Sequence, residues 1–378
     1  MELINSLANT FLNWRSFKTD RKIIVIESDD WGGLRTNGKE TLKALNAIHD
    51  NVAKDRFTQL DNIASEDDLN GLFDVLRSVT DTNGNPAVVT ANVSVANPDF
   101  TKIKEHNFEE FFYEPFYETI KRTADGKQVL SLWKSGMAEG IFQPQLHGRE
   151  HVHALAWLAE LRAGNPHLLR AFEQHAWGIP YQPLTRQKRG NLQAALDMYD
   201  MEGEQQFQEA WLVESSQIFE RYFGYKSMTF IPPAYTWHSS IGKTLEAIGV
   251  AGVQGIKLQY QPIANTGKYK KTPRYTGKML TAETRFLVRN VFFEPASNPG
   301  KDWFTTTLRG IERAFLNRQP AIIGSHRINF IGSLDEGNRL RNLQMLRKVL
   351  AQASRKWFDV EFMSSDKLSD LISSEKAN

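Results

Sequence analysis

The chain has 378 residues, of which 41% are hydrophobic and 24% are charged. These proportions are typical of globular proteins with a sizeable core and exclude global disorder. The 46 basic and 44 acidic residues nearly cancel to a net charge of +2, and no long basic stretch predicts a nucleic-acid partner. Because the chain has no cysteine, disulfides, thiolate nucleophiles and cysteine-based metal sites are excluded. Histidine and carboxylate side chains remain as the strong metal ligands.

The beginning of the chain shows no export signal. Residues 1–22 contain no basic segment followed by a sustained apolar one, and no small-residue cleavage site follows them. No segment reaches the roughly 18 consecutive apolar residues of a transmembrane helix. We therefore expect a cytoplasmic protein with no membrane span.

Short apolar, β-branched runs alternate with helical patterns along the whole chain. This alternation predicts an α/β fold built from repeated β–α units around a mainly parallel sheet or barrel. We expect a single domain over residues 1–378, with insertions at about 178–204 and 255–285. The predicted strands, in chain order, are 22–28, 87–95, 141–146, 227–231, 286–293, 321–325 and 358–363. The predicted helices are 39–49, 66–79, 108–122, 130–139, 151–175 with a break near 164–166, 205–223, 239–248, 303–318, 334–356 and a terminal helix.

The first predicted strand ends directly at two carboxylates, Asp29 and Asp30. Neighbouring side chains at a strand end point in different directions, so one can bind a cation while the other acts as a general base. A turn or a helix cap is the alternative interpretation of such a pair.

Two histidines, His147 and His151, follow the strand at 141–146. On one helical turn both rings could face the same cation, although the spacing alone could also be incidental. On the same helical spacing, His153 should point away from them. His326 ends a later strand, where an ionisable imidazole could act in proton transfer or be merely hydrogen-bonded.

A rigid corner, Pro232-Pro233-Ala234-Tyr235, follows the strand at 227–231. It could present a backbone N–H to a developing oxyanion, or it could be structural only. Because the carboxyl ends of parallel strands converge on one face, we expect all four strand ends to form one site.

In this order the segments resemble the motifs of the polysaccharide deacetylase family, the NodB-homology group of carbohydrate esterases. Residues 27–32 are similar to the family's Thr-Phe-Asp-Asp-Gly motif, with Trp31 where glycine is expected. Residues 147–151 are similar to His-Ser/Thr-x-x-His, with Gly148 in place of the hydroxyl residue. Residues 231–235 resemble Arg-Pro-Pro-Tyr-Gly, and 324–326 resemble Leu-Leu-His. The resemblance extends over about residues 22–373.

The resemblance implies a distorted (β/α) barrel, commonly of seven strands, with one divalent metal, zinc in our expectation. Carried over by motif position, Asp30, His147 and His151 would hold this metal. Asp29 would be the general base for the attacking water, and His326 the general acid for the departing amine or hydroxyl.

Other residues would contact substrate. The backbone N–H near Ala234 would help to hold the oxyanion, and Trp31, Tyr235 and Trp237 could stack on sugar rings or serve only in packing. The family's motif-three arginine, which orients the base, is Ile231 here. Arg149 or Arg327, each next to a motif histidine, could replace it, and Arg149 could also contact substrate.

The sequence therefore predicts a metal-dependent hydrolase that removes an acetyl group from a sugar, glycan or glycan precursor. One alternative is hydrolysis of another amide or of a glycosidic bond. The other is a catalytically silent barrel that binds glycan or a protein partner, an alternative that the missing arginine favours.

Overall fold

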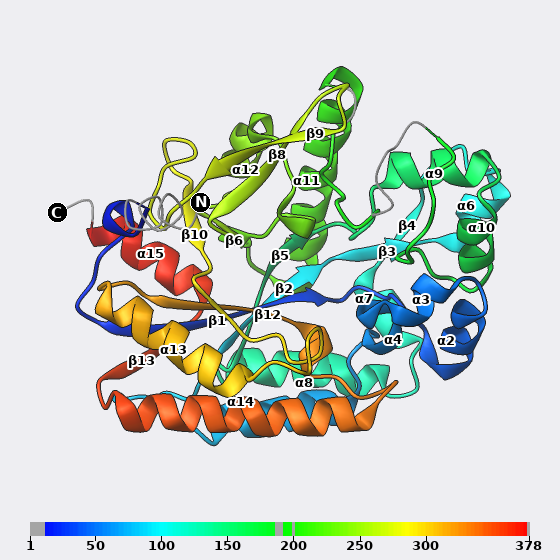
Figure 1. Cartoon of the computed structure of the whole chain (residues 1–378). Helices are drawn as coiled ribbons and strands as arrows, with labels where there is room; N and C mark the ends of the chain where they lie inside the picture. Colours follow the sequence, from blue (N-terminus) through cyan, green and yellow to red (C-terminus); the bar gives the residue numbers. More distant parts are fainter. Residues whose placement is uncertain (1–11, 186–191, 199–200, 376–378) are drawn as a thin grey trace.

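The centre of the molecule is a curled parallel sheet (Figure 1). The computed structural model describes residues 12–185, 192–198 and 201–375. The sheet has nine strands in the order β10-β7-β6-β5-β2-β1-β12-β11, with β13 paired to β1. Its strands are β1 (Lys22–Trp31), β2 (Val89–Ser94), β5 (Phe142–Gly148), β6 (Thr229–Phe230), β7 (Gly252–Gly255), β10 (Arg285–Val288), β11 (Val291–Phe292), β12 (Ala321–His326) and β13 (Val360–Met363).

One chain segment joins the two edges of this sheet. Strand β10 pairs with β7 and strand β11 pairs with β12, yet only Arg289 and Asn290 separate β10 from β11. Arg289 donates its N–H to Gly255 of β7 (2.8 Å), and Asn290 donates to Ile322 of β12 (3.2 Å). If β10 and β11 are taken as one bent strand, β1, β2, β5, β6, β7, β10/β11 and β12 form a ring of seven. The predicted distorted (β/α) barrel is thus confirmed.

The barrel interior is apolar at the amino ends of the strands. Side chains alternate between the two faces of a strand, so every second residue of β1, β10 and β12 points inward. Helix α15 (Ser365–Glu375) contacts β1, β6, β7 and β10 and closes this end. The buried side chains of this layer are Phe17, Ile23, Val25, Leu287, Ile322, Leu368 and Ile372.

The next layer of the interior is charged. Two residues beyond Val25 and Leu287 on the same strand faces come Glu27 and Arg289, and the two side chains form a buried ion pair of 2.7 Å. The facing residue of β12 is Gly324, where a Cβ would lie 2.6 Å from Cδ of Arg289. The glycine therefore leaves the space that the long arginine side chain fills.

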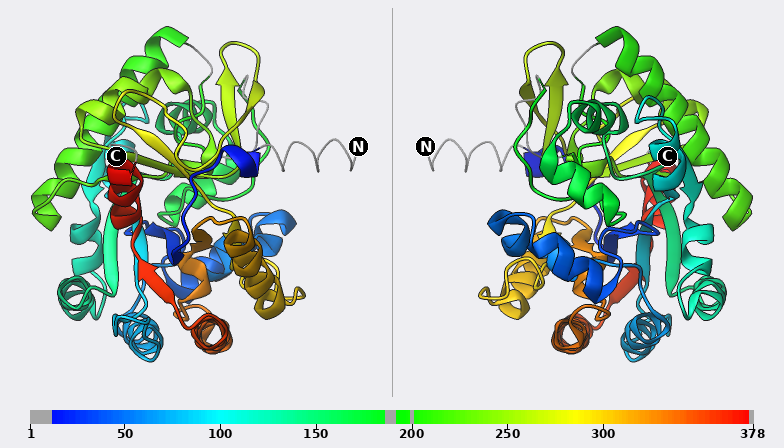
Figure 2. Two further views of the ribbon diagram at one scale, coloured as in Figure 1. Left: turned by 90° about the vertical axis from the view of Figure 1, so that its left-hand side faces the viewer. Right: turned by 90° about the vertical axis from the view of Figure 1, so that its right-hand side faces the viewer.

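Helices surround the sheet. Four of them, α5, α8, α13 and α14, pack round the outside of the lower half (Figures 1 and 2). Short helices gather at the carboxyl ends of the strands, on the right of Figure 1. The helices are α2 (Gly38–Asn46), α3 (Asp50–Lys54), α4 (Arg56–Leu60), α5 (Glu66–Arg77), α6 (Phe100–Glu105), α7 (Phe116–Lys121), α8 (Gly126–Ala138), α9 (Ala154–Arg162), α10 (Pro166–Glu173), α11 (Met201–Phe223), α12 (Gly242–Ala247), α13 (Trp303–Leu316) and α14 (Glu336–Lys356), with 3-10 turns η1 (Pro233–Tyr235), η2 (Ser239–Ile241) and η3 (Arg327–Asn329).

Two predicted helices are built differently. The segment 108–122 contains strand β4 (Tyr113–Pro115), which pairs antiparallel with β3 (Ala96–Pro98), and only then helix α7. The segment 151–175 begins as a loop and then forms α9 and α10, which are separated at Gly164 and Asn165 as the sequence predicted. Asn165 caps α10 by accepting from the backbone of His167, and Pro166 starts that helix, so the break has a local cause.

The two segments that we expected to be insertions have the following structure. Residues 255–285 carry an antiparallel hairpin of β8 (Leu258–Ile263) and β9 (Lys268–Pro273). Residues 192–198 of the other insertion pack against the barrel, and 186–191 and 199–200 lie outside the described residues, as do residues 1–11 of the segment searched for an export signal.

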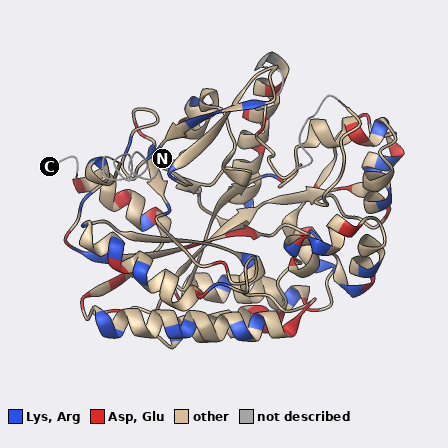
Figure 3. Ribbon diagram, in the orientation of Figure 1, with Lys and Arg blue, Asp and Glu red and all other residues tan. Residues whose placement is uncertain are grey.

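Within the described part of the chain, no helix is both long and apolar enough to cross a membrane. Basic side chains recur along the outer helix α14, and its acidic residue, Glu336, lies in the first turn (Figure 3).

The end of β5 depends on one glycine. Gly148 has a φ of +101°, a region that disfavours side chains, and a Cβ there would lie 1.8 Å from the indole of Trp211. Trp211 of α11 is buried and donates to Glu150 (2.9 Å). The large indole thus occupies the space where the related motif has a hydroxyl side chain.

We predict that Gly148→Ala destabilises the protein more than Gly140→Ala. Gly140 also has a positive φ (+71°), but its Cβ would meet no atom within 4 Å, so only backbone strain of about 1–2 kcal/mol is expected there. The clash with Trp211 should add about 1–3 kcal/mol in Gly148→Ala. Urea unfolding measures both variants, and equal losses would show that the indole does not restrict this position.

Candidate metal centre and active site

Asp29 and Asp30 reach the site through an irregularity in β1. Ser28 pairs with Ala91 of β2 and Trp31 pairs with Val93, so β1 has one more residue than its partner at this point. Such a bulge re-aims side chains, and Asp30 accordingly has a positive φ of 73°. Both carboxylates line the same pocket as a result.

His147 is the penultimate residue of β5, and His151 lies in the loop that follows. The expected single helical turn is therefore wrong: the positive φ of Gly148 turns the chain and brings the rings to 4.9 Å between centroids. The ring of Trp177 stacks on His151 at 6.1 Å and 19°. His153, next along the chain, caps α9 by accepting from Ala156 and contacts the carbonyl of Asp197 (3.0 Å).

Asp30, His147 and His151 form a group that could hold a metal ion. Oδ1 of Asp30 lies 3.4 Å from Nε2 of each ring, and one ligand atom from each of the three residues lies within 4.8 Å of the others. Ligands about 2.0–2.1 Å from a tetrahedral zinc ion are separated by about 3.3–3.4 Å, so the spacing fits.

The hydrogen bonds around this group also fit a cation. Nδ1 of His147 is 2.8 Å from the carbonyl of Ile231, so Nδ1 donates this hydrogen bond and orients the ring with Nε2 facing Asp30. Oδ1 of Asp30 and Nε2 of His147 are buried without a hydrogen-bond partner. Burial lowers the pKa of His151 to about 3, so this ring is neutral and cannot balance the charge of Asp30. A buried carboxylate beside a neutral imidazole is an arrangement that a bound cation stabilises.

Asp29 is held by a residue that we did not expect in the site, Arg289. The guanidinium donates to both oxygens of Asp29 (2.7 and 2.6 Å), and Nε donates to Glu27 (2.7 Å). Asn92 donates a further hydrogen bond to Asp29 (2.8 Å). Burial alone would raise the pKa of Asp29, but the interactions with Arg289 lower it, so Asp29 is a carboxylate.

His326 lies opposite, 3.8 Å from Oδ2 of Asp29 through its Nε2. Its Nδ1 is 2.6 Å from Glu294, which also accepts from Asn329 (2.8 Å). Burial alone would lower the pKa of His326, but the carboxylate of Glu294 raises it to about 10. The imidazole is therefore protonated at neutral pH, and its Nε2 proton points toward the pocket.

All five of these motif residues line one cavity of about 60 Å³. Ala234 and Tyr235 form part of its wall with positive φ angles of 53° and 55°, and the Tyr235 hydroxyl accepts from Arg289 (2.9 Å). Phe57 and Gln193 complete the wall. The cavity has room for an acyl group but not for a whole sugar ring.

Three expected substrate contacts lie elsewhere. Trp31 is buried in the outer core, edge-on to Phe142 (5.0 Å), and Trp237 is buried beside Phe286 (6.1 Å). Arg149 is paired with Glu150 and Glu214. None of the three lines the cavity.

The expected replacements for the motif arginine are also committed to other partners. Arg327 pairs with the buried Asp61 (2.8 Å) and Arg149 pairs as described above, so neither contacts Asp29. Arg289 and Asn290 interrupt an otherwise apolar predicted strand, and Glu294 follows that strand directly. A charge inside a buried strand and an acid at its end were the signals that could have identified both residues.

Comparisons with known proteins support the fold. No family model and no curated protein matches the sequence. The solved structures similar to it include a proposed glycoside hydrolase/deacetylase from Parabacteroides distasonis, with a TM-score of 0.50 and 6% identity over 94% of this chain and 72% of that one. A proposed polysaccharide deacetylase from Pseudomonas aeruginosa PAO1 has a TM-score of 0.43 and 10% identity over 93% and 91%.

A third similar structure is the 4-alpha-glucanotransferase from Thermococcus litoralis, with a TM-score of 0.46 and 10% identity. The similarity covers 92% of this chain but only 40% of that protein. Of these three, the structure from Parabacteroides distasonis, with its TM-score of 0.50, shows a shared fold.

We predict that Arg289→Gln destabilises the protein by about 3–5 kcal/mol, because it leaves Glu27 and Asp29 buried without their cation. Arg274→Gln is the matched control, since Arg274 is also buried but donates to a neutral partner, Gln259 (2.8 and 2.6 Å). Its replacement should cost about 1–2 kcal/mol. Urea unfolding measures the loss of stability in both variants. A smaller loss for Arg289→Gln than for Arg274→Gln would contradict the role of Arg289 as the cation that balances the two buried carboxylates.

Proposed function

We propose that this protein is a metal-dependent hydrolase that removes an acetyl or similarly small acyl group from a sugar, glycan or glycan precursor. Asp30, His147 and His151 would hold one divalent cation, zinc by the chemistry of the ligands. The observation that carries the proposal is that Asp29 and His326 line the same cavity as this group, with Oδ2 of Asp29 and Nε2 of His326 3.8 Å apart.

When bound, the divalent cation would lower the pKa of a water molecule and polarise the acyl carbonyl. Asp29 would accept the proton of the attacking water through Oδ2, while Arg289 and Asn92 keep the carboxylate in position. His326 would then give its Nε2 proton to the departing amine or hydroxyl as the acyl bond breaks. The products are a carboxylate and the free sugar amine or hydroxyl.

The wall of the cavity would position the acyl carbon. Ala234 and Tyr235 are held in a left-handed turn after Pro233, and the backbone N–H near Ala234 would donate to the oxyanion. The cavity of about 60 Å³ supports a small acyl group, with the sugar outside. The activities named for the similar structures, deacetylase and glycoside hydrolase, are consistent with a carbohydrate as the substrate.

The missing motif-three arginine was the main support for a catalytically silent barrel. Arg289 supplies a cation to Asp29 from a different strand, so this support is weakened. A base and an acid with opposite fixed charges would have no purpose in a module that only binds.

We predict acetate release by the zinc-loaded protein from N-acetylglucosamine, its oligosaccharides or an N-acetylated nucleotide sugar. Asp29→Asn and His326→Gln should each lower kcat about 10²–10⁴-fold, the usual contribution of a general base or acid, without loss of zinc. His167→Gln, on α10 and outside the cavity, should leave kcat unchanged.

Acetate is measured by an enzyme-coupled assay, and zinc by elemental analysis. A zinc-loaded protein that releases no acetate from any of these compounds would refute the deacetylase proposal. Release of another acid, or of a reducing sugar, would instead indicate an amide or glycosidic hydrolase.

A further inference from the structure

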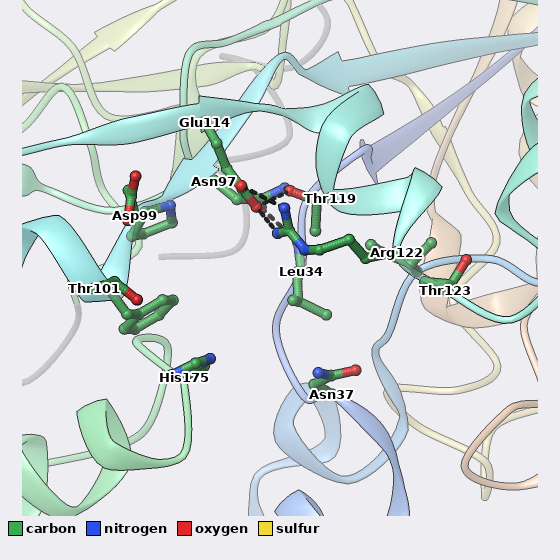
Figure 4. A pocket seen from close by; sticks show the side chains of 13 residues that line it. Leu34, Asn37, Asn97, Asp99, Thr101, Glu114, Thr119, Arg122, Thr123 and His175 are labelled. Atoms are coloured by element: carbon green, nitrogen blue, oxygen red, sulfur yellow. Dashed lines mark hydrogen bonds and ion pairs between the residues drawn. The ribbon is translucent and has the colours of Figure 1, made fainter.

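A second and larger cavity lies beside the metal centre. Its volume is about 310 Å³, against about 60 Å³ for the cavity at the metal ligands. It is enclosed by the loop after β1, by β3 and β4, and by the ends of α6 and α7 (Figure 4). We call it the Asn97 pocket after the buried amide in its wall. Its volume is at the lower end of the range of about 300–1,000 Å³ for small-molecule sites.

The charged side chains that line the Asn97 pocket, Asp99, Glu114 and Arg122, each have an ion-pair partner. Arg122 donates two hydrogen bonds to Glu114, one of them 2.7 Å long, and the dashed lines of Figure 4 mark them. Asp99 is paired with Lys102 (3.0 Å). Because positive and negative side chains balance, the pocket favours neither an anion nor a cation as its ligand.

The remaining lining suits a neutral ring that carries hydroxyl groups. Thr101 and Asn37 offer a hydroxyl and an amide group, and the Thr123 hydroxyl, which donates to the carbonyl of Ile120 (2.8 Å), can still accept a hydrogen bond. The ring of Phe100 lies in the wall, stacked on His175 at 5.1 Å and 11°. Hydrogen-bonding groups around an apolar ring match the polar edge and apolar face of a sugar.

The wall of the Asn97 pocket is hydrogen-bonded to both chain segments that carry the metal ligands, 30–34 and 147–151. Asn97 accepts from the backbone of Leu34 (2.7 Å) and donates to the carbonyl of Gly32 (3.0 Å), in the loop that follows β1.

On the other side, Val95 and Ala96 donate to the carbonyls of Gly148 (2.9 Å) and Arg149 (2.6 Å), between His147 and His151. One short segment, 95–97, thus connects all three ligands to the pocket.

We propose that the Asn97 pocket is a second binding site, for one unit of a neutral sugar, and that its occupancy is coupled to metal binding. A sugar that orders segment 95–97 would also order the segments that hold the metal-ligating residues. Sugar and metal should therefore each strengthen the binding of the other by the same factor. This site is separate from the cavity in which acyl hydrolysis is proposed.

The test uses glucose and maltose, neutral sugars with no acyl group, and the full chain. Saturation-transfer NMR with the metal-free protein should detect binding. Thr123→Phe and Thr101→Phe place a ring in the pocket and should each raise Kd at least tenfold. Thr82→Phe, at an exposed position in a turn, is the matched control and should leave Kd unchanged. Saturating sugar should raise the zinc affinity of the wild-type protein at least fivefold.

Thermal unfolding identifies folded variants, and the two phenylalanine variants provide independent readings. No sugar binding by the folded wild-type protein would overturn the proposal, as would binding that both pocket variants retain. Loss of sugar binding in His147→Ala with retention in Thr123→Phe would place the sugar at the metal centre instead. Binding of inorganic phosphate in place of either sugar would contradict a neutral ligand. Zinc affinity that is independent of sugar would contradict the coupling.

Discussion

The buried contact of Arg289 with Glu27 and Asp29 determines how the inside of this barrel is organised. A guanidinium with no solvent exposure is stable only when its charge is matched, and the two carboxylates come from alternate residues of β1, on the other side of β12. Gly324 on β12 makes room for it, and the Tyr235 hydroxyl and the amide of Gln254 complete its surroundings. This contact lies between the apolar layer at the amino ends of the strands and the cavity at their carboxyl ends.

The same contact links stability with chemistry. Glu27 has only structural contacts, since it also accepts from Ser365 at the start of α15 (2.8 Å). Asp29, in contrast, lines the cavity. The strained backbone at Asp30 and the tight turn at Gly148 aim the metal ligands at each other. Strain of this kind persists only where surrounding contacts fix the chain, and here the bulge of β1, Trp211 and segment 95–97 provide them.

Much of this arrangement could be predicted from the sequence, because strand ends are local features. The alternating pattern predicted the barrel, and the strands before Asp29, His147 and His326 are placed as expected. Arg289 could not be assigned in this way, since its contact with Asp29 spans 260 residues and depends on where the sheet bends. The geometry of His147 and His151 was also missed, because four-residue spacing fits a helical turn as well as a glycine turn.

The aromatic residues show the same limit. Trp31 follows the two carboxylates, but the bulge that turns Asp30 toward the cavity sends the indole into the outer core, where it donates to Ser28 (2.9 Å). Sequence position next to a site therefore did not indicate contact with it. Conversely, Gln193 and Phe57 lie far from every motif and still line the cavity.

The central claim is that Asp30, His147 and His151 bind one metal ion. Anomalous diffraction at the zinc edge from crystals grown with zinc tests it directly, with elemental analysis of His147→Ala and His153→Ala as the matched pair. We predict a single strong peak between Oδ1 of Asp30 and the two Nε2 atoms, one zinc per chain in His153→Ala and none in His147→Ala. Zinc located elsewhere, or the same zinc content in both variants, would contradict the account.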